Sequence, residues 1–471
     1  MSLATIPTEL HHLIAGYLDT DRDVNNYRLI CRSTRNAIDE PKCYFWRDRF
    51  LRTFDPEQGK TAKELKTLYQ KRRKLLRRGA HFKTGNGKKE TAVLPVIRDL
   101  INNSHAGGGT DGASPSLNYQ ILTTFARDQT LLSNVCRFFK KIDRTTKKQM
   151  RDAPLLQAIQ IVFSHLSLSL DPVPFPTFGF EESQQAVYAN YTEAPMFGGF
   201  NGLEINVAWV LHCVNFFKYH LTRAEEQTMF EAYDGLHRDE HPQGWPERLR
   251  EGSHVLGRHW KGTYAYLERH EMMHIRTVKP TQQIYPDMNI NGGDKALQTL
   301  TLDFPPSDVA ANMPWPRVFE RHLNSLPTGH KQPKTRIQHR KGMPPPPAEA
   351  ENVRFQGAGW DDEQYYSAGY LNPLPPQEGI PGWQRMTMMK YFITPNGAFD
   401  ADALWAYEGV VLPGGQIIVG RWWSPEEDSS DLYSGPFIFW NVDKAVALED
   451  GDEGEGEEMD TSGVIDMLPR A

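Results

Sequence analysis

The period of the hydrophobic pattern changes at about residue 255 of this 471-residue chain. Before that point, apolar residues recur three and four positions apart, as they do along one face of an α-helix. After it, the sequence consists of short aromatic and β-branched runs separated by Gly and Pro, a pattern typical of β-strands. The length suggests roughly two to four domains. The two patterns therefore predict a multidomain α+β protein whose helices precede its strands.

The second half of the sequence contains eight runs with the composition of strands. They are Trp260–Leu267, Ala296–Phe304, Val353–Gln356, Gln364–Leu371, Met386–Ile393, Leu404–Leu412, Gln416–Trp423 and Pro436–Val442. Pro413-Gly414-Gly415 has the composition of a hairpin turn. Short strands with frequent turns suggest a barrel or a sandwich, and we expect an antiparallel β-barrel over residues 251–445. The polar, basic and Pro-rich residues 324–350 are predicted to be a disordered insertion within it.

Residues 1–54 are predicted to form a module of three short helices. The apolar residues of the first helix share one stripe and are Leu10, Leu13, Ile14, Tyr17 and Leu18. A module of this size buries too little surface to be stable alone, so its remaining apolar face needs a partner or the rest of the chain. The pattern by itself fits an interaction module and also the first helical hairpin of a larger domain.

The same segment resembles an F-box. The residues that carry the resemblance are Ile6-Pro7, Glu9-Leu10, Leu18-Asp19, Arg28-Leu29-Ile30-Cys31-Arg32 and Trp46-Arg47. His11 stands where the family prefers Leu, and Ile6 and Ile30 are conservative departures. An F-box binds the Skp adaptor of a cullin–RING ubiquitin ligase. The resemblance therefore implies an adaptor-binding surface formed by Pro7, Leu10, Ile14, Leu18, Val24 and Leu29.

Residues 55–250 are predicted to be a helical middle region with a flexible Gly/Ser-rich loop at 102–116. Within it, residues 60–89 contain twelve Lys or Arg and one acid. Three interpretations remain open: a solvated helix face, a nuclear-import signal at Lys71-Arg72-Arg73-Lys74, or a nucleic-acid-binding segment. Nucleic-acid binding calls for nearby aromatic residues, and this segment offers Tyr69 and Phe82. We therefore do not expect a nucleic-acid partner.

Acidic residues are concentrated at the end of the chain. Residues 449–471 contain nine acids and Arg470, a formal charge of −8 within a total of −6. The preceding residues are close to neutral, so the total charge identifies no class of partner. Residues 446–471 are predicted to be a disordered acidic tail.

The order of aromatic motifs in the second half is similar to that in the C-terminal domain of a fungal family of F-box proteins. The motifs are Trp260-Lys261-Gly262-Thr263-Tyr264, Met389-Lys390-Tyr391, Trp405-Ala406-Tyr407-Glu408-Gly409, Gly420-Arg421-Trp422 and Phe437-Ile438-Phe439-Trp440. Related animal F-box proteins use a β-barrel as the substrate receptor. The resemblance implies recruitment of a protein substrate without identifying it.

A barrel mouth is the usual place for a ligand site in such a domain. Its candidate substrate-binding residues are Arg385, Lys390, Arg421 and Trp422, which would offer a carboxylate or a peptide cations beside aromatic faces. The alternative is that each is an ordinary strand residue with a solvated end.

His270-Glu271-Met272-Met273-His274 matches the HExxH pattern of zinc hydrolases. Thr277 and Pro280 stand where one zincin class has a Gly and a third His, so we expect a coincidental match. The sequence has no GxSxG, P-loop or Cys–His arrangement that points to catalysis. We therefore predict no catalytic residue, no metal and no cofactor, and keep a zinc hydrolase as an alternative.

The four cysteines lie far apart and form no Cys-x-x-Cys pair, which fits a reducing compartment. The first residues lack a basic region followed by an apolar run. The most apolar stretch, 205–217, is short and contains polar residues, so we expect no signal peptide and no membrane partner. We expect an intracellular protein of the cytoplasm, the nucleus or both.

The two resemblances together predict a non-catalytic substrate-recognition subunit of an SCF-type cullin–RING ubiquitin ligase. In this interpretation residues 1–54 bind the Skp adaptor, and the barrel recruits a protein substrate that the sequence does not name. The alternative in another class is a nucleic-acid or chromatin-associated protein that uses residues 60–89.

Overall fold

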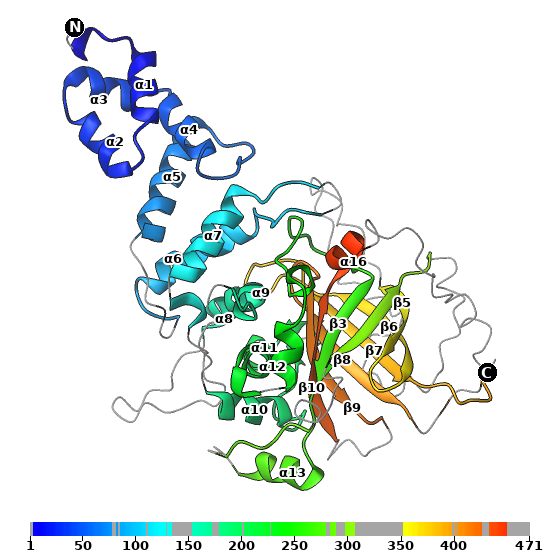
Figure 1. Ribbon diagram of the computed structural model, residues 1–471. Coiled ribbons are helices and arrows are strands. Elements are labelled where there is room, and N and C mark those ends of the chain that lie inside the picture. The colour runs from blue at the N-terminus through cyan, green and yellow to red at the C-terminus, as the bar shows by residue number, and fades with distance from the viewer. Residues whose placement is uncertain are drawn as a thin grey trace, which may run out of the picture. The chain divides into compact units, whose positions relative to one another are not determined.

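The computed structural model contains two compact units (Figure 1). Unit 1 comprises Met1–His81 and Gly87–Thr130, and unit 2 comprises Phe82–Asn86 and Leu131–Ala471. The division falls inside the predicted helical middle region, residues 55–250. The residues that the structure describes are 3–77, 82, 85–109, 112–128, 130–133, 153–171, 179–199, 202–226, 228–278, 283–288, 297–306, 352–397, 400, 403–425 and 433–449.

Unit 1 is helical. Its elements are η1 (Leu3–Thr5), α1 (Thr8–Gly16), α2 (Asp21–Arg28), α3 (Arg32–Ile38), α4 (Tyr44–Leu51), α5 (Ala62–Arg77), α6 (Glu90–Ile101) and α7 (Leu117–Asp128). Pro7 is the N-cap of α1, where its missing N–H costs nothing. The Thr20 side chain caps α2 by accepting a hydrogen bond from the backbone N–H of Asp23. The described part of the loop at 102–116 is closed by hydrogen bonds, including one from Ser116 N to His105 O of 3.0 Å.

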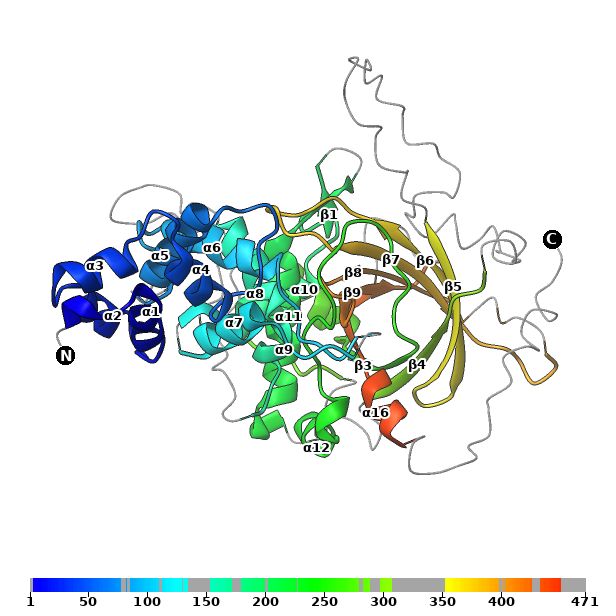
Figure 2. The same cartoon turned by 90° about the horizontal axis from the view of Figure 1, so that it is seen from above.

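Unit 2 begins with a helical layer. Its elements are η2 (Thr130–Leu132), α8 (Pro154–Val162), α9 (Ser164–Ser167), α10 (Phe180–Tyr188), β1 (Phe197–Gly198), β2 (Glu204–Ile205), α11 (Val207–Thr222), η4 (Ala224–Glu226), α12 (Thr228–Asp234) and η5 (Arg238–Glu240). η2 starts at the last residue of unit 1. Helix α11 is buried along almost its whole length, which explains its nearly continuous apolar sequence. Helices α10 and α11 lie against strands of the barrel (Figure 2).

The remainder of unit 2 is a closed antiparallel barrel. Its strands are β3 (His259–Tyr264), β4 (Gln298–Asp303), β5 (Val353–Trp360), β6 (Gln364–Pro373), β7 (Gln384–Tyr391), β8 (Trp405–Val411), β9 (Ile417–Trp423) and β10 (Ser434–Asn441). Each strand pairs with the next along the chain, and β10 closes the barrel on β3. All eight predicted strands are confirmed, and the barrel is confirmed over the sandwich.

Two helices flank the barrel strands. Helix α13 (Arg269–Thr277) follows β3, and α16 (Asp443–Glu449) follows β10. The last residues of α16 belong to the predicted acidic tail, whose remainder lies outside the described residues, as does the predicted insertion at 324–350. The predicted turn at Pro413-Gly414-Gly415 joins β8 to β9, with Leu412 N donating to Ile417 O over 2.9 Å. Gly414 has φ +96°, in the region that favours glycine.

Side chains alternate between the inside and the outside of the barrel wall. The inward-facing set includes a buried core at one end, made of Trp260, Leu300, Leu302, Phe355, Leu371, Met386, Val411, Ile418 and Phe439. A Cβ on Gly420, which faces inward, would meet the Phe437 ring at 2.6 Å, so glycine makes room for that ring. The barrel interior is thus filled at the end where β3 and β9 begin, which leaves the opposite end for a cavity.

Among the described helices, none combines the length and the apolar character that a bilayer span requires. The cysteines in the described part of the chain, Cys31, Cys43 and Cys213, are free. Cys213 is buried on α11, with its Sγ 3.9 Å from the carbonyl oxygen of Gly420, so it contributes to packing between the helical layer and the barrel.

Candidate functional site

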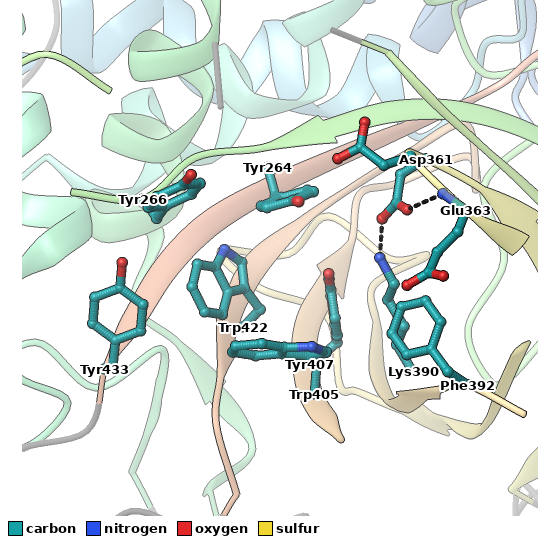
Figure 3. A pocket seen from close by; sticks show the side chains of 11 residues that line it. Tyr264, Tyr266, Asp361, Glu363, Lys390, Phe392, Trp405, Tyr407, Trp422 and Tyr433 are labelled. Carbon is teal, nitrogen blue, oxygen red and sulfur yellow. Dashed lines mark hydrogen bonds and ion pairs between the residues drawn. The ribbon is translucent and has the colours of Figure 1, made fainter. Parts of the chain in front are cut away.

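A cavity of about 330 Å³ lies at the open end of the barrel. It is formed where β3, β7 and β9 end, where β8 and β10 begin, and at the β5–β6 hairpin (Figure 3). Most of its lining is aromatic: Tyr264, Tyr266, Phe392, Trp405, Tyr407, Trp422 and Tyr433. The charged residues of the lining are Asp361, Asp362, Glu363 and Lys390.

Trp422 is the centre of the aromatic cluster. Its ring meets that of Trp405 edge-on, with the centroids 5.3 Å apart, and it lies edge-on to Tyr433 at 5.7 Å. The indole N–H of Trp422 donates to Ala265 O over 3.2 Å, and the Tyr433 hydroxyl donates to Leu267 O over 2.8 Å. These bonds satisfy the polar atoms of two rings, so the rings are held in place by the barrel before any ligand binds.

Lys390 is the cation within the cavity lining. It lies on β7 and is buried, and its Nζ forms an ion pair and hydrogen bond with Asp361 (Figure 3). The same Nζ is 4.2 Å from the ring centroid of Tyr365 and 5.5 Å from that of Phe392. Burial lowers the pKa of Lys390, and the Asp361 carboxylate opposes that shift. The Lys390 ammonium is therefore held between aromatic rings and the Asp361 carboxylate.

The other two acids lie at the tip of the β5–β6 hairpin. Asp362 and Glu363 are exposed there. Burial raises the pKa of Tyr264, and the nearby charges of Asp361 and Asp362 raise it further. The charged residues of the lining are thus three acids and one base.

The structure separates the four residues predicted to bind a substrate. Lys390 and Trp422 line the cavity. Arg385 and Arg421 face the outside of the barrel wall and are buried there. Arg421 directly precedes Trp422 on β9, and neighbouring residues of a strand point to opposite faces. The expected group of three cations at the mouth is therefore not formed.

Arg385 and Arg421 instead take part in packing under the helical layer. Arg385 pairs with Glu408, which is also buried, and its guanidinium lies 5.0 Å from the ring centroid of Phe197. Arg421 donates to Ala189 O over 3.2 Å and stacks on Trp209 at 5.1 Å. Burial lowers the pKa of Arg421 to about 10. Both arginines thus attach the helical layer to the barrel.

Sequence reasoning missed most of the cavity lining. Trp405 and Tyr407 alternate on β8 and face the same side of the wall as Trp422. The acids follow Trp360 between two predicted strands, in the segment Asp361-Asp362-Glu363. The signal that could have found these residues is the period-two alternation of aromatic residues together with an acidic hairpin tip.

The second candidate surface is on the N-terminal helices of unit 1. Leu10 on α1 is 48% exposed, and Leu29 at the end of α2 is 66% exposed. Other large apolar side chains of this region are also exposed: Leu13, Ile14, Tyr17 and Ile30. Isolated exposed apolar residues are ordinary, but such a set on adjacent helices is typical of an interaction surface.

The six predicted adaptor-binding residues are not all on that surface. Pro7, Leu10, Ile14 and Leu29 are exposed, Leu18 is half-buried, and Val24 is buried. Val24 is 1% exposed and belongs to the core of the module. His11, which departs from the F-box pattern, is also turned inward. Its Nδ1 is 2.7 Å from the Tyr27 hydroxyl and joins α1 to α2, which explains a polar residue at this position.

The basic segment at 60–89 is partly neutralised within unit 1. On α5, Arg72 is buried and pairs with Glu57 at 2.5 Å, and Arg73 pairs with Asp21 at 2.9 Å. Both belong to the candidate nuclear-import signal, in which Lys71 and Lys74 are exposed. Two of its four basic side chains therefore form ion pairs with acids of the same unit. These ion pairs stabilise the packing of α5.

The HExxH segment lies on α13. His270 and His274 are exposed, and His274 Nδ1 forms a hydrogen bond with the Tyr285 hydroxyl. Within the part of the chain that the structure describes, no group of three His, Cys, Asp or Glu side chains could hold a metal ion.

Comparisons of the chain with protein-family models, with curated proteins and with solved structures found no match.

Proposed function

We propose that this protein is the substrate-recognition subunit of an SCF-type cullin–RING ubiquitin ligase. Unit 1 would bind the Skp adaptor, and the barrel of unit 2 would recruit a protein substrate. The observation that carries the proposal is the exposure of aliphatic side chains, Leu10 and Leu29 among them, within the segment that resembles an F-box. Leaving such side chains in water costs free energy that a partner surface would recover.

The chemistry of this surface suits a hydrophobic groove on a partner. Leu10 and Ile14 of α1 and Tyr17 at its C-cap are spaced as residues of one helix face. Helices that dock into apolar grooves use side chains at this spacing as anchors. A few such anchors generally supply most of the binding free energy. The buried core of the module, with Ala15, Val24 and Ile38, would hold the helices that present them.

In this role the protein contributes proximity and no covalent chemistry. A receptor that holds a substrate lysine near a conjugating enzyme raises its effective concentration there. No cofactor is needed for that role. The two compact units would separate its two tasks, with adaptor binding in unit 1 and substrate binding in unit 2.

The test is the affinity of the purified full chain for purified Skp adaptor, measured by calorimetry. We expect the double variant Leu10→Ala/Leu29→Ala to raise the Kd by roughly 100-fold, because two interfacial anchors would be truncated. Both side chains are exposed, so the truncations leave the core intact.

Val255→Ala is the matched control. Val255 is an apolar residue of unit 2 that is 62% exposed, close to the exposure of Leu29. We expect it to bind the adaptor as the wild type does. The proposal fails if the wild-type chain does not bind the adaptor, or if the double variant binds as tightly as the wild type.

A further inference from the structure

The cavity at the barrel mouth has the charge distribution of a cation site. Its three carboxylates outnumber Lys390, the basic residue among the described residues that line it. Asp361 is already paired with Lys390. Among the described residues, no ion pair neutralises Asp362 or Glu363, and both are exposed at the hairpin tip. A positive group entering the cavity would therefore meet two unneutralised carboxylates.

The aromatic lining of the cavity also favours a positively charged ligand. The faces of aromatic rings carry partial negative charge and attract cations, with Trp the strongest of the three ring types. Trp405 and Trp422 both line the cavity, and Trp422 is fixed by its hydrogen bond to Ala265 O. The Trp422 ring is therefore in place before a ligand binds, so little ordering of that ring would oppose the binding of a cation.

Lys390 shows which groups of this lining contact a cation, although burial lowers the pKa of its own ammonium group. Its Nζ lies over the Tyr365 ring at 4.2 Å and pairs with Asp361, so one ammonium is already held by rings and a carboxylate. A carboxylate ligand would have to displace Asp361 from Lys390 and approach Asp362 at the entrance, where like charges repel. The arginines that could have bound an anion, Arg385 and Arg421, face the other side of the wall.

We propose that the cavity binds the positively charged side chain of a basic residue in a protein substrate. A volume of about 330 Å³ is at the lower end of the range for small-ligand sites, which suits a single side chain. This inference rests on the proposed function for the statement that the ligand belongs to a protein substrate. The recognition of a cation follows from the lining alone.

The experiment measures the binding of four small probes to the purified full chain at low ionic strength by calorimetry. They are choline, its uncharged isostere 3,3-dimethylbutan-1-ol, Nα-acetyl-lysine methylamide and acetate. We expect both cations to bind with a Kd on the order of millimolar. We expect the uncharged isostere to bind at least about fivefold more weakly than choline, and acetate not to bind.

Variants connect that binding to the cavity. Asp362→Asn/Glu363→Gln removes the two exposed charges and should weaken binding of both cations about threefold or more. Trp405→Leu removes one ring and should weaken binding by a similar factor. The matched control is Glu231→Gln/Glu251→Gln, which removes two exposed acids of unit 2 that do not line the cavity. We expect the control to bind both cations as the wild type does.

Each remaining outcome overturns the proposal. Equal binding of choline and its isostere would identify an apolar site, and binding of acetate would identify an anion site. Binding of choline without the lysine derivative would assign the cavity to a small quaternary ammonium compound. Absence of binding by every probe would also contradict it. Adaptor binding is measured in a separate experiment with the Leu10→Ala/Leu29→Ala variant. Failure of the ligase proposal and failure of cation recognition are therefore distinguishable.

Discussion

The two candidate recognition surfaces differ in how far their apolar side chains are exposed to water. On unit 1, aliphatic side chains are exposed on helices, and Leu13 of α1 is 54% exposed. At the barrel mouth of unit 2, aromatic rings are recessed around a cavity and bordered by acids. An exposed aliphatic surface gains affinity from the area it buries against a large partner. A recessed cavity gains selectivity because few groups fit its shape and charge. Under the proposed function, this difference predicts that unit 1 binds one adaptor and that the cavity of unit 2 selects among substrates.

The largest predicted effect is on the stability of unit 2 and concerns an ion pair in the wall of the barrel. Glu408→Ala should destabilise unit 2 by about 3–5 kcal/mol, because it leaves the buried Arg385 without its counter-charge. Urea unfolding followed by tryptophan fluorescence measures this change in the full chain. Adaptor binding should be unchanged in the absence of urea, since it depends on unit 1. A variant as stable as the wild type would show that this ion pair does not hold the wall together.

A smaller effect separates the core of unit 1 from its surface. Val24→Ala truncates a buried side chain and should lower the free energy of unfolding of unit 1 by about 1–3 kcal/mol. Leu29→Ala truncates an exposed one and should change that free energy by less than about 0.5 kcal/mol.

Adaptor affinity should show the reverse order for the same pair of variants. Leu29→Ala is expected to weaken adaptor binding, and Val24→Ala to retain it under conditions where the variant is folded. Thermal unfolding and calorimetry provide the two measurements. If Val24→Ala weakened binding while Leu29→Ala did not, the surface defined here would be misplaced.

The smallest predicted effect is the pH dependence of the stability of unit 2, which we expect His220 to cause. His220 lies between two acids, with Nδ1 2.7 Å from Glu226 and Nε2 3.1 Å from Asp287. Burial alone would lower the pKa of His220, but the hydrogen bonds and charges of Asp287 and Glu226 outweigh burial and raise it. Asp287 also accepts a hydrogen bond from the Tyr188 hydroxyl at 2.5 Å, which joins its segment to α10.

Because the folded-state pKa of His220 is raised, its stabilising contribution is complete below the unfolded pKa of about 6.5. That contribution is lost as the pH rises through the folded-state pKa. One proton is involved, so the free energy of unfolding should fall by at most about 1.4 kcal/mol per pH unit. Denaturant unfolding across this pH range measures the slope. His220→Gln should remove the dependence, and an unchanged slope in that variant would assign it to other groups.

The strands could be predicted from the sequence because their aromatic and β-branched runs are separated by clear turn residues. The inward direction of Lys390 and Trp422 follows the same alternation. The positions of Arg385 and Arg421 could not be predicted, since a charged residue on a strand ordinarily points to water. Here the helical layer covers the outer wall, and Arg421 finds Ala189 O and Trp209. That cover comes from segments more than two hundred residues away in the sequence.

Helix α5 shows the same limitation. Helix α5 has the composition of a solvated basic helix, yet Arg72 and Arg73 pair with Glu57 and Asp21. The Arg73–Asp21 pair joins α5 to α2 and so connects residues of two regions that the sequence pattern predicted separately. Pairing between acids and bases of different helices depends on tertiary packing, which local periodicity does not encode.

The central claim is that the exposed helices of unit 1 form the adaptor-binding surface. Hydrogen exchange of the full chain, with and without Skp adaptor, tests it most directly. The account predicts increased protection of amides in Thr8–Gly16 and around Leu29, and unchanged exchange in the strands of the barrel. Protection confined to the barrel, or no change in α1 and α2 at saturating adaptor, would contradict it.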